Sequence, residues 1–286
     1  MSTCFFVSDL HGRTEIFLKL FERIDAEHPE ALFLGGDFFP SPFGTAQSAI
    51  SHWDFLDNFL FKELAQLKRT MMDAYPRIFI IMGNDDGRFE EDSVREGERK
   101  ELWEYMHNRK MLFQTFMIHG YSYVPPTPFL LKDWERYDVS RYADPGCISP
   151  EEGKYSIPVP DDEKRYSTIK NDLDRLAGGE DLERAVFLFH APPHQTKLDR
   201  LVSDGKMIDH VPIDPSVGSI AIKRFIEAGQ PLLTLHGHIH ESARLTGSWR
   251  DRIGRTHVFS GAHDGPELAL IRFDLEDLDK ATRELI

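Results

Sequence analysis

The chain has 286 residues, 41% hydrophobic and 29% charged, which is enough to bury a core as one large domain or two small ones. Its formal net charge of −14 at pH 7 excludes a global basic field that could hold a nucleic-acid backbone and favours a small substrate. The two cysteines, Cys4 and Cys147, are too few for a disulfide-stapled secreted protein, and we expect both to be reduced thiols.

The sequence contains no recognisable export or membrane signal. Asp9 interrupts the first apolar run before a signal-peptide hydrophobic region could form, and no later run approaches the length of a membrane span. We therefore expect a cytoplasmic protein without a membrane partner.

Short apolar runs alternate with longer segments of helical period, which is typical of an α/β fold. Apolar residues three to four positions apart predict helices over Glu15–Ala26 and Ser51–Asp73. Runs rich in Phe, Ile, Val and Leu predict strands at Cys4–Val7, Ala31–Leu34, Arg77–Met82, Met111–Ile118, Ala185–Phe189, Pro231–Leu235, Val258–Ser260 and Leu268–Phe273.

The segment from about residue 121 to 180 differs in kind, because its many prolines permit no long regular element. We interpret it as an ordered insertion with one helix near Asp161–Leu176, within a single domain over residues 1–286. Its aromatic residues favour a small core of the insertion over stacking on a nucleobase: Tyr121, Tyr123, Phe129, Trp134 and Tyr137.

Polar residues gather where five of the predicted strands end. In chain order they are Asp9 and His11; Asp37; Asn84, Asp85 and Asp86; His190; and His236 and His238. Open α/β sheets place their ligand sites at the carboxyl ends of strands, so these clusters are expected to converge on one edge. For each residue alone, a role in capping a strand end or forming a turn is the better interpretation, but the ordered set favours a metal site.

Carboxylate and amide oxygens with imidazole nitrogens suit borderline divalent metals and lack the thiolates of a structural zinc site. We expect two ions, with Mn²⁺ favoured and Fe²⁺, Zn²⁺ or Co²⁺ as alternatives. Neighbouring glycines allow sharp turns and a close backbone approach to an anion: Gly12, Gly35, Gly36, Gly83 and Gly237.

These motifs, in this order and spacing between residues 9 and 240, resemble the signature blocks of the calcineurin-like metallophosphoesterase superfamily. The resemblance implies a four-layer α/β/β/α sandwich of two packed mixed sheets. It also implies ligand sets of Asp9, His11 and His238 for one metal and Asn84, His190 and His236 for the other, with Asp37 bridging. The implied chemistry is phosphate-ester hydrolysis by a hydroxide that bridges the two ions.

Asp85 departs from the family pattern, which commonly has a histidine after the Gly-Asn pair. A carboxylate beside two cations should have a lowered pKa and be a poor general acid. Three hypotheses follow: His194 supplies the proton, the leaving group needs little protonation, or Asp85 joins the metal shell.

Four further positions lie close to the motifs in sequence. Arg13 and Arg88 could contact a phosphate oxygen, although surface salt bridges are the more common role. His194 and His240 could contact the substrate or support a ligand, or could be exposed. The remaining histidines are interpreted as structural or solvated, with His263 as a reserve candidate.

The sequence as a whole predicts a metal-dependent phosphodiesterase acting on a small diester, which could be a nucleotide derivative. The diester preference follows from the missing histidine at position 85, because a monoester with a poor leaving group has more need of an acid. Alternatives are a phosphomonoesterase or pyrophosphohydrolase at the same site, a non-catalytic binding module, or a nuclease, which the acidic charge disfavours. Protein phosphatase activity is less favoured, since no arginine precedes the Gly83-Asn84 motif, and homo-oligomerisation stays open.

Overall fold

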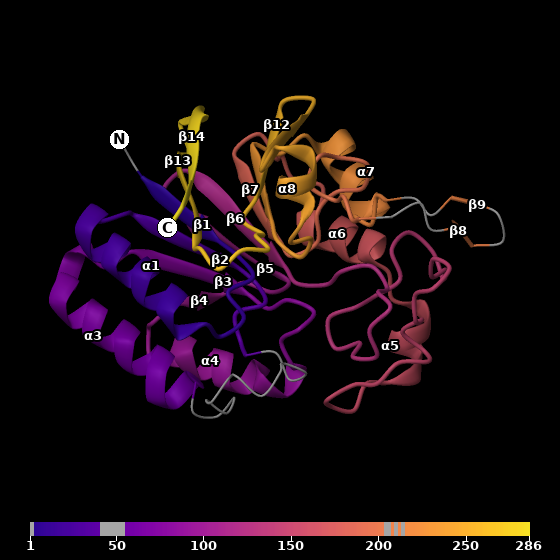
Figure 1. Cartoon of the computed structure of the whole chain (residues 1–286), viewed down its shortest axis with the longest axis horizontal. Helices are drawn as coiled ribbons and strands as arrows, with labels where there is room; N and C mark the ends of the chain where they lie inside the picture. Colours follow the sequence, from indigo (N-terminus) through magenta and orange to yellow (C-terminus); the bar gives the residue numbers. More distant parts are fainter. Residues whose placement is uncertain (1–2, 41–54, 203–206, 209–210, 213–214) are drawn as a thin grey trace.

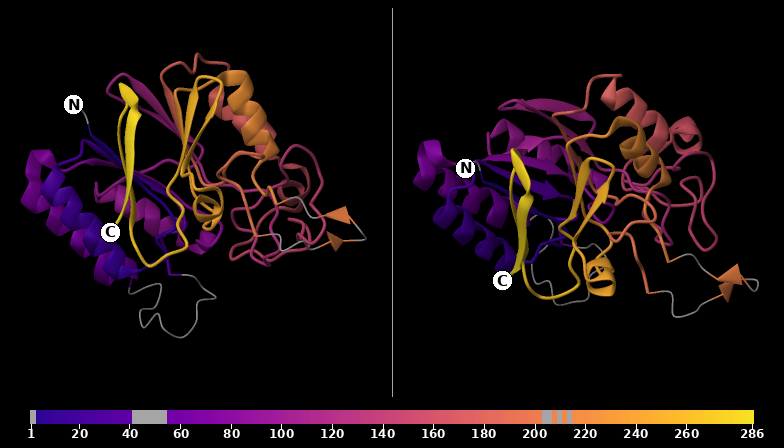
Figure 2. Two further views of the ribbon diagram at one scale, coloured as in Figure 1. Left: turned by 45° about the horizontal axis from the view of Figure 1, so that its top comes forward. Right: turned by 90° about the horizontal axis from the view of Figure 1, so that it is seen from above.

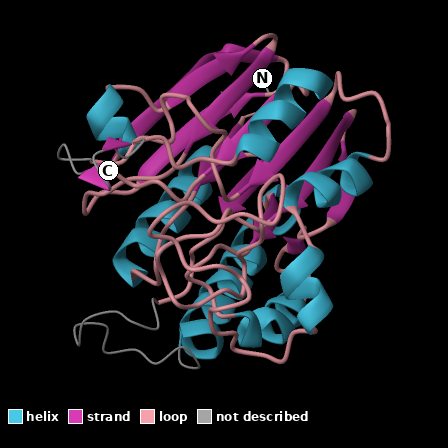
Figure 3. Ribbon diagram, turned by 90° about the vertical axis from the view of Figure 1, so that its right-hand side faces the viewer, coloured by secondary structure: helices cyan, strands magenta, loops and turns pink. Residues whose placement is uncertain are grey.

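The computed structural model describes residues 3–40, 55–202, 207–208, 211–212 and 215–286. Two six-stranded mixed sheets pack face to face, with helices on their outer faces (Figure 1). This arrangement is the α/β/β/α sandwich that the family resemblance implied. Figure 3 shows the strands of the two sheets with helices on either side of them and loops gathered beyond the strand ends.

The first sheet has the strand order β14-β13-β1-β2-β3-β4. β1 (Cys4–Val7), β2 (Ala31–Gly35), β3 (Arg77–Ile81) and β4 (Glu104–Tyr105) are parallel neighbours, so their carboxyl ends share one edge. β13 (Ala269–Asp274) and β14 (Asp277–Leu285) complete the sheet in antiparallel pairing.

The second sheet has the order β11-β12-β10-β7-β6-β5. β6 (Phe116–Tyr121), β7 (Ala185–Phe189), β10 (Leu233–His236) and β12 (Thr256–Ser260) run parallel to one another. β5 (Arg109–Phe113) and β11 (Arg250–Ile253) are antiparallel edge strands. A separate two-stranded sheet joins β8 (Met207–Ile208) and β9 (Val211–Pro212).

Alternating side chains along each strand divide the core into layers. Cys4 and Phe6 of β1 face the second sheet, whereas Phe5 and Val7 face the helices. Both sets are fully buried. A strand that is buried on both faces has a continuous apolar sequence, which explains why these strands could be predicted well from the sequence.

Helices cover the outer face of each sheet (Figure 2). On the first sheet lie α1 (Thr14–Glu27), α3 (Phe61–Met71) with its preceding π-helix (Phe55–Leu60), and α4 (Glu91–Arg99), and on the second lie α6 (Ile169–Ala177) and α7 (Ile220–Gly229). α8 (Ser242–Thr246), 3₁₀ turns at Met72–Ala74 and Arg88–Glu90, and α5 (Asp161–Tyr166) complete the elements. Every described helix is too short or too polar to span a membrane.

Two of the predicted elements were wrong. Met111–Ile118 is not one strand but parts of β5 and β6, because Gln114 takes a left-handed φ of 55° and turns the chain into a hairpin. The helix predicted over Asp161–Leu176 is broken at Ser167 and Thr168, where extended Thr168 caps α6 by accepting a hydrogen bond from the Asn171 backbone N–H. The first four residues of the predicted helix at Ser51–Asp73 lie outside the described residues.

The aromatic residues of the insertion do not form the separate core that the sequence had favoured, because Tyr121, Tyr123 and Trp134 belong to the same hydrophobic cluster as Phe5 and Val7 of β1. Tyr121, Tyr123, Trp134 and Tyr137 are buried, but Phe129 is 61% exposed. Most of the segment consists of loops around α5 and α6 (Figure 1).

Candidate metal centre

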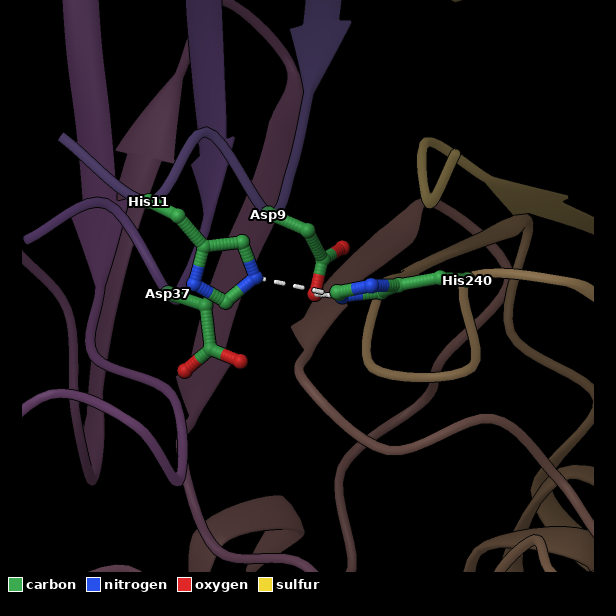
Figure 4. Close-up of side chains that lie close together, drawn as sticks. All are labelled: Asp9, His11, Asp37 and His240. Atoms are coloured by element: carbon green, nitrogen blue, oxygen red, sulfur yellow. Dashed lines mark hydrogen bonds and ion pairs between the residues drawn. The ribbon is translucent and has the colours of Figure 1, made fainter. Parts of the chain in front are cut away.

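Four polar side chains from three strand-end loops meet at one point (Figure 4). Asp9, His11, Asp37 and His240 each offer a ligand atom, and these atoms lie within 4.8 Å of one another. Asp9 and His11 follow β1, Asp37 follows β2, and His240 follows β10. The two sheets therefore both contribute to the cluster. Asp9, His11 and Asp37 are among the residues selected at the strand ends, whereas His240 was a candidate only for substrate contact or support of a ligand.

Four residues at this point have left-handed backbones. Asp9, His11, Asp37 and His238 have φ values of 60°, 47°, 52° and 73°. Such conformations are costly for residues other than glycine and tend to persist where the surrounding structure enforces them at functional sites. Here they turn the side chains back across the strand ends and towards one another.

Two glycines allow this convergence because side chains of the cluster press on their backbones. A Cβ at Gly83 would overlap Asp37 Oδ1, and a Cβ at Gly237 would overlap Ser8 Oγ and approach Asp9 Oδ2 at 2.6 Å. Any larger residue would push the carboxylates out of place.

A second group of side chains adjoins the first and shares Asp37 with it. His190 Nε2 lies 3.2 Å from Asp37 Oδ2 and 3.0 Å from Asn84 Oδ1. The His190 ring is also near that of His238, with centroids 5.3 Å apart. Since His190 Nδ1 donates to the Gly35 carbonyl at 2.7 Å, its Nε2 is directed at the two oxygens.

Asp86 joins the loops that carry these groups. Its carboxylate accepts hydrogen bonds from the backbone N–H groups of Asp37, Phe39 and Gly83 at 2.8–2.9 Å. Asp86 is fully buried. The Gly-Asn-X-Asp pattern signalled this residue, but only the structure shows that it positions Asp37.

The charges of the two groups are interdependent. Burial opposes ionisation of Asp9, but its hydrogen bond to His240 holds the Asp9 pKa below the usual range. Burial opposes protonation of His190 and His240, but Asp37 raises the His190 pKa to about 10 and Asp9 raises that of His240 to about 9. Buried carboxylates here therefore depend on nearby positive charge.

His236 is not brought into either group. Its Nδ1 donates to the Ala191 carbonyl at 2.7 Å, and its Nε2 lies 2.8 Å from Thr234 Oγ1. His236 is the last residue of β10, and the two-residue period of the strand places it on the same face as Thr234. His238, beyond the strand, instead donates its backbone N–H to Asp9 at 2.9 Å.

Asp85 lies at the rim of the cluster. Its Oδ2 is 3.8 Å from His11 Nδ1, and its backbone N–H donates to Asp37 Oδ1 at 2.8 Å. Burial and the nearby Asp37 carboxylate raise the Asp85 pKa to about 7. The lowering expected from two adjacent cations would act against these effects.

The other candidates from the sequence lie in separate contacts. His194 Nδ1 faces Asp199 Oδ2 at 3.8 Å, and Arg13 donates to the Gly265 carbonyl at 3.0 Å. Arg88 lies 3.5 Å from Glu91 and 3.8 Å from Glu163, so its guanidinium faces carboxylates. Among the remaining histidines, His263 is hydrogen-bonded to Glu267 at 3.0 Å.

The donor set fits divalent metal ions. Buried carboxylate oxygens and imidazole nitrogens from several loops point at common centres without a thiolate, and Asp37 borders both groups. The nearby histidines His11 and His238 both have lowered pKa values, His238 to about 3, mainly because they are buried. Neutral imidazoles are the form that binds metals.

Comparison with known proteins agrees with this geometry. The family model described as calcineurin-like phosphoesterase matches residues 3–242, a range that includes every residue of both groups. None of the curated proteins compared with the sequence matches it significantly.

Two solved structures share the fold at low sequence identity. The protein TT1561 of Thermus thermophilus is 15% identical with a TM-score of 0.56, and the match covers 99% of this chain and 98% of that one. A dimetal phosphatase from Danio rerio is 12% identical with a TM-score of 0.53, and the match covers 94% and 91% of the two chains.

Proposed function

Since the chain belongs to the calcineurin-like phosphoesterase family, we propose that it is a dinuclear metallohydrolase that cleaves a small phosphodiester. The observation that carries the proposal is the position of Asp37. Its carboxylate belongs to the cluster with Asp9, His11 and His240, and it also lies 3.2 Å from His190 in the second group. Two adjoining groups with a shared carboxylate would suit two divalent ions held side by side.

We assign Asp9, His11 and His240 to one ion and Asn84, His190 and His238 to the other, with Asp37 shared. This assignment differs from the sequence-based one in replacing His236 by His240 and moving His238 to the second ion. The contacts of His236 with Ala191 and Thr234 support the change. Mn²⁺ is the expected metal, and Fe²⁺, Zn²⁺ or Co²⁺ would suit the same ligands.

The residues of the chain have distinct tasks in this proposal. Bound divalent ions would lower the pKa of water and offset negative charge on the phosphate. Asp86 holds the Asp37 and Gly83 loops together, and the Gly35 carbonyl orients His190. These contacts fix the ligand atoms before a substrate arrives, which limits the reorganisation needed for reaction.

The diester preference depends on Asp85. A carboxylate at the rim supplies negative charge where the family commonly has a histidine, and bound cations would favour its ionised form. A dianionic monoester would be repelled more strongly than a monoanionic diester. A small diester, such as a nucleotide derivative, therefore suits the site better than a monoester.

The test is hydrolysis of bis-p-nitrophenyl phosphate against p-nitrophenyl phosphate by chelator-stripped protein, with Mn²⁺, Fe²⁺, Zn²⁺, Co²⁺ or Mg²⁺ restored singly. We expect metal-dependent turnover that favours the diester, and we expect Asp85→His to move the preference towards the monoester. Monoester preference in the native protein would refute the diester proposal and leave the metal site intact. Full metal occupancy without turnover of either ester or of a wider panel would favour a binding module.

A further inference from the structure

Asp85 contacts residues from both proposed ligand sets. Its Oδ1 accepts a hydrogen bond from Asn84 Nδ2 at 3.2 Å, and its Oδ2 lies 3.8 Å from His11 Nδ1. Its backbone N–H donates to the shared Asp37 at 2.8 Å. The Asp85 side chain thus adjoins one ligand from each set, and its backbone adjoins the carboxylate that the two sets share.

The contact with His11 bears on the tautomer of that imidazole. His11 Nε2 lies 3.2 Å from His240 Nε2, so Nε2 is the nitrogen that faces the cluster. A neutral imidazole that binds metal through Nε2 carries its proton on Nδ1, and metal-bound histidines commonly donate that proton to a carboxylate or carbonyl. Asp85 is the carboxylate that His11 Nδ1 faces. At 3.8 Å the pair is an electrostatic contact that is longer than a direct hydrogen bond.

The contact with Asn84 bears on the orientation of its amide. An amide can bind a cation only through its oxygen, because its NH₂ group is a donor. Asn84 Nδ2 donates to Asp85, while Asn84 Oδ1 faces His190 Nε2 at 3.0 Å. Asp85 therefore favours the rotamer that presents oxygen to the second group.

We propose that Asp85 is a positioning residue that orients His11 and Asn84 at the same time and so couples the two metal positions. This inference rests on the proposed dinuclear site and extends it. It replaces the alternatives of Asp85 as general acid or direct ligand. Asp85 is also not one of the four residues whose ligand atoms lie within 4.8 Å of one another.

The experiment measures metal binding rather than activity alone. Chelator-stripped native protein, Asp85→Asn and Asp85→Ala are titrated with Mn²⁺ and with Zn²⁺ by calorimetry, which gives stoichiometry and affinity. Asparagine offers one acceptor oxygen and can serve only one of the two contacts, whereas alanine serves neither. We expect two ions per chain in all three proteins. Affinity should be about 10-fold weaker in Asp85→Asn and up to about 100-fold weaker in Asp85→Ala, as for other residues that support metal ligands.

Two controls accompany the titration. Asp264→Ala removes a carboxylate of similar exposure that pairs with Arg244, and it should leave metal affinity unchanged. Thermal unfolding of the stripped proteins shows whether each variant folds. Long-range ¹H–¹⁵N spectra of the Zn²⁺ forms report the His11 tautomer, which should be protonated at Nδ1 in the native protein and heterogeneous in Asp85→Ala.

The outcomes separate this inference from the proposed function. If native protein binds fewer than two ions, the dinuclear site itself fails. If native protein binds two ions and Asp85→Ala binds them equally well with an unchanged His11 tautomer, only the positioning role is overturned. Loss of one ion from Asp85→Ala would make Asp85 a ligand. A fall in turnover at unchanged affinity, largest for esters with poor leaving groups, would make it a general acid.

Discussion

Two regions of this molecule contain buried charged side chains, and the charges are compensated in different ways in the two regions. In the insertion, buried charges have fixed partners: Lys132 pairs with Glu135, and Arg136 lies 2.6 Å from Asp172, while Asp133 accepts hydrogen bonds from the backbone N–H groups of Arg88 and Ser156. At the strand ends, three carboxylates face the same few histidines, namely Asp9, Asp37 and Asp85. Paired charges hold loops together, whereas convergent carboxylates create a site that favours cations.

The insertion also illustrates why a charged cluster alone does not indicate a site. Arg136 contacts Asp172, Glu163 and the Tyr123 hydroxyl, and its guanidinium lies 3.9 Å from the Tyr123 ring centroid. Its donors are directed at fixed acceptors within the fold. These contacts join loops of the insertion to α5 and α6 and stabilise the segment.

The largest expected effect concerns which histidine of the 236–240 run belongs to the metal site. His240→Gln should weaken binding of one ion by more than about 100-fold, since a ligand contributes more than a residue that only supports one. The matched variant His236→Gln should retain two ions, because the hydrogen bonds of the His236 ring go to Ala191 and Thr234 and not to a proposed ligand. Metal titration by calorimetry checks both.

The reverse result would contradict our assignment of ligands. If His236→Gln lost an ion while His240→Gln kept both, the assignment made from the sequence would be restored. Circular dichroism of the stripped variants provides the folding control.

The next effect concerns the paired charges of the insertion. Lys132→Met would leave the Glu135 carboxylate buried without its cation and should destabilise the fold by about 3–5 kcal/mol. The double variant Lys132→Met, Glu135→Leu should recover part of this loss, because an apolar pair needs no charge compensation but leaves the Thr127 groups that bonded to Glu135 without their acceptor. Urea unfolding measures the free energies.

An exposed pair provides the matched control for this substitution. Lys170→Met removes a cation that lies 3.1 Å from Asp174 on the surface of α6, and it should change stability by less than about 1 kcal/mol. Equal effects of Lys132→Met and Lys170→Met would show that the buried pair contributes no more than a surface one.

The smallest expected effect concerns His119, a buried histidine that belongs neither to the ion pairs of the insertion nor to the cluster at the strand ends. His119 is fully buried, stacks on Phe187 with centroids 4.3 Å apart, and has no hydrogen-bond partner among the described residues. Burial lowers its pKa from 6.5 to about 4, so between these values the unfolded chain binds a proton that the folded chain does not. Its contribution to stability is therefore complete above pH 6.5 and declines as the pH falls towards 4.

His119→Phe should remove this pH dependence and preserve the stacking. Relative to the native protein, the variant should gain about 2 kcal/mol in unfolding free energy between about pH 7.5 and pH 5, as measured by urea unfolding at each pH. If the difference in unfolding free energy between the variant and the native protein were the same at every pH in this range, the pKa of His119 would not change on folding.

The sequence by itself predicted much of the architecture and most of the polar residues that come together at the strand ends. Continuous apolar runs located β1, β2, β3 and β7 to within one residue, because strands buried on both faces need no polar positions. Polar residues directly after those runs had to meet at one edge, since parallel neighbouring strands end on the same side. Asp9, Asp37, Asn84 and His190 could be selected on this basis alone.

Only the tertiary structure shows in which direction the side chains near the strand ends point. The resemblance made His236 a ligand and left His240 outside the ligand sets. In the structure, His236 is the last residue of β10 and its Nε2 lies 2.8 Å from Thr234 Oγ1, whereas His240 lies beyond the strand with its Nε2 3.2 Å from Asp9 Oδ1. The position of Asp85 between His11 and Asn84 arises where the loops after β1 and β3 meet. Spacing along the chain gives distance from a strand end, whereas the direction of a side chain depends on the local backbone turn and on the packing of the neighbouring strand.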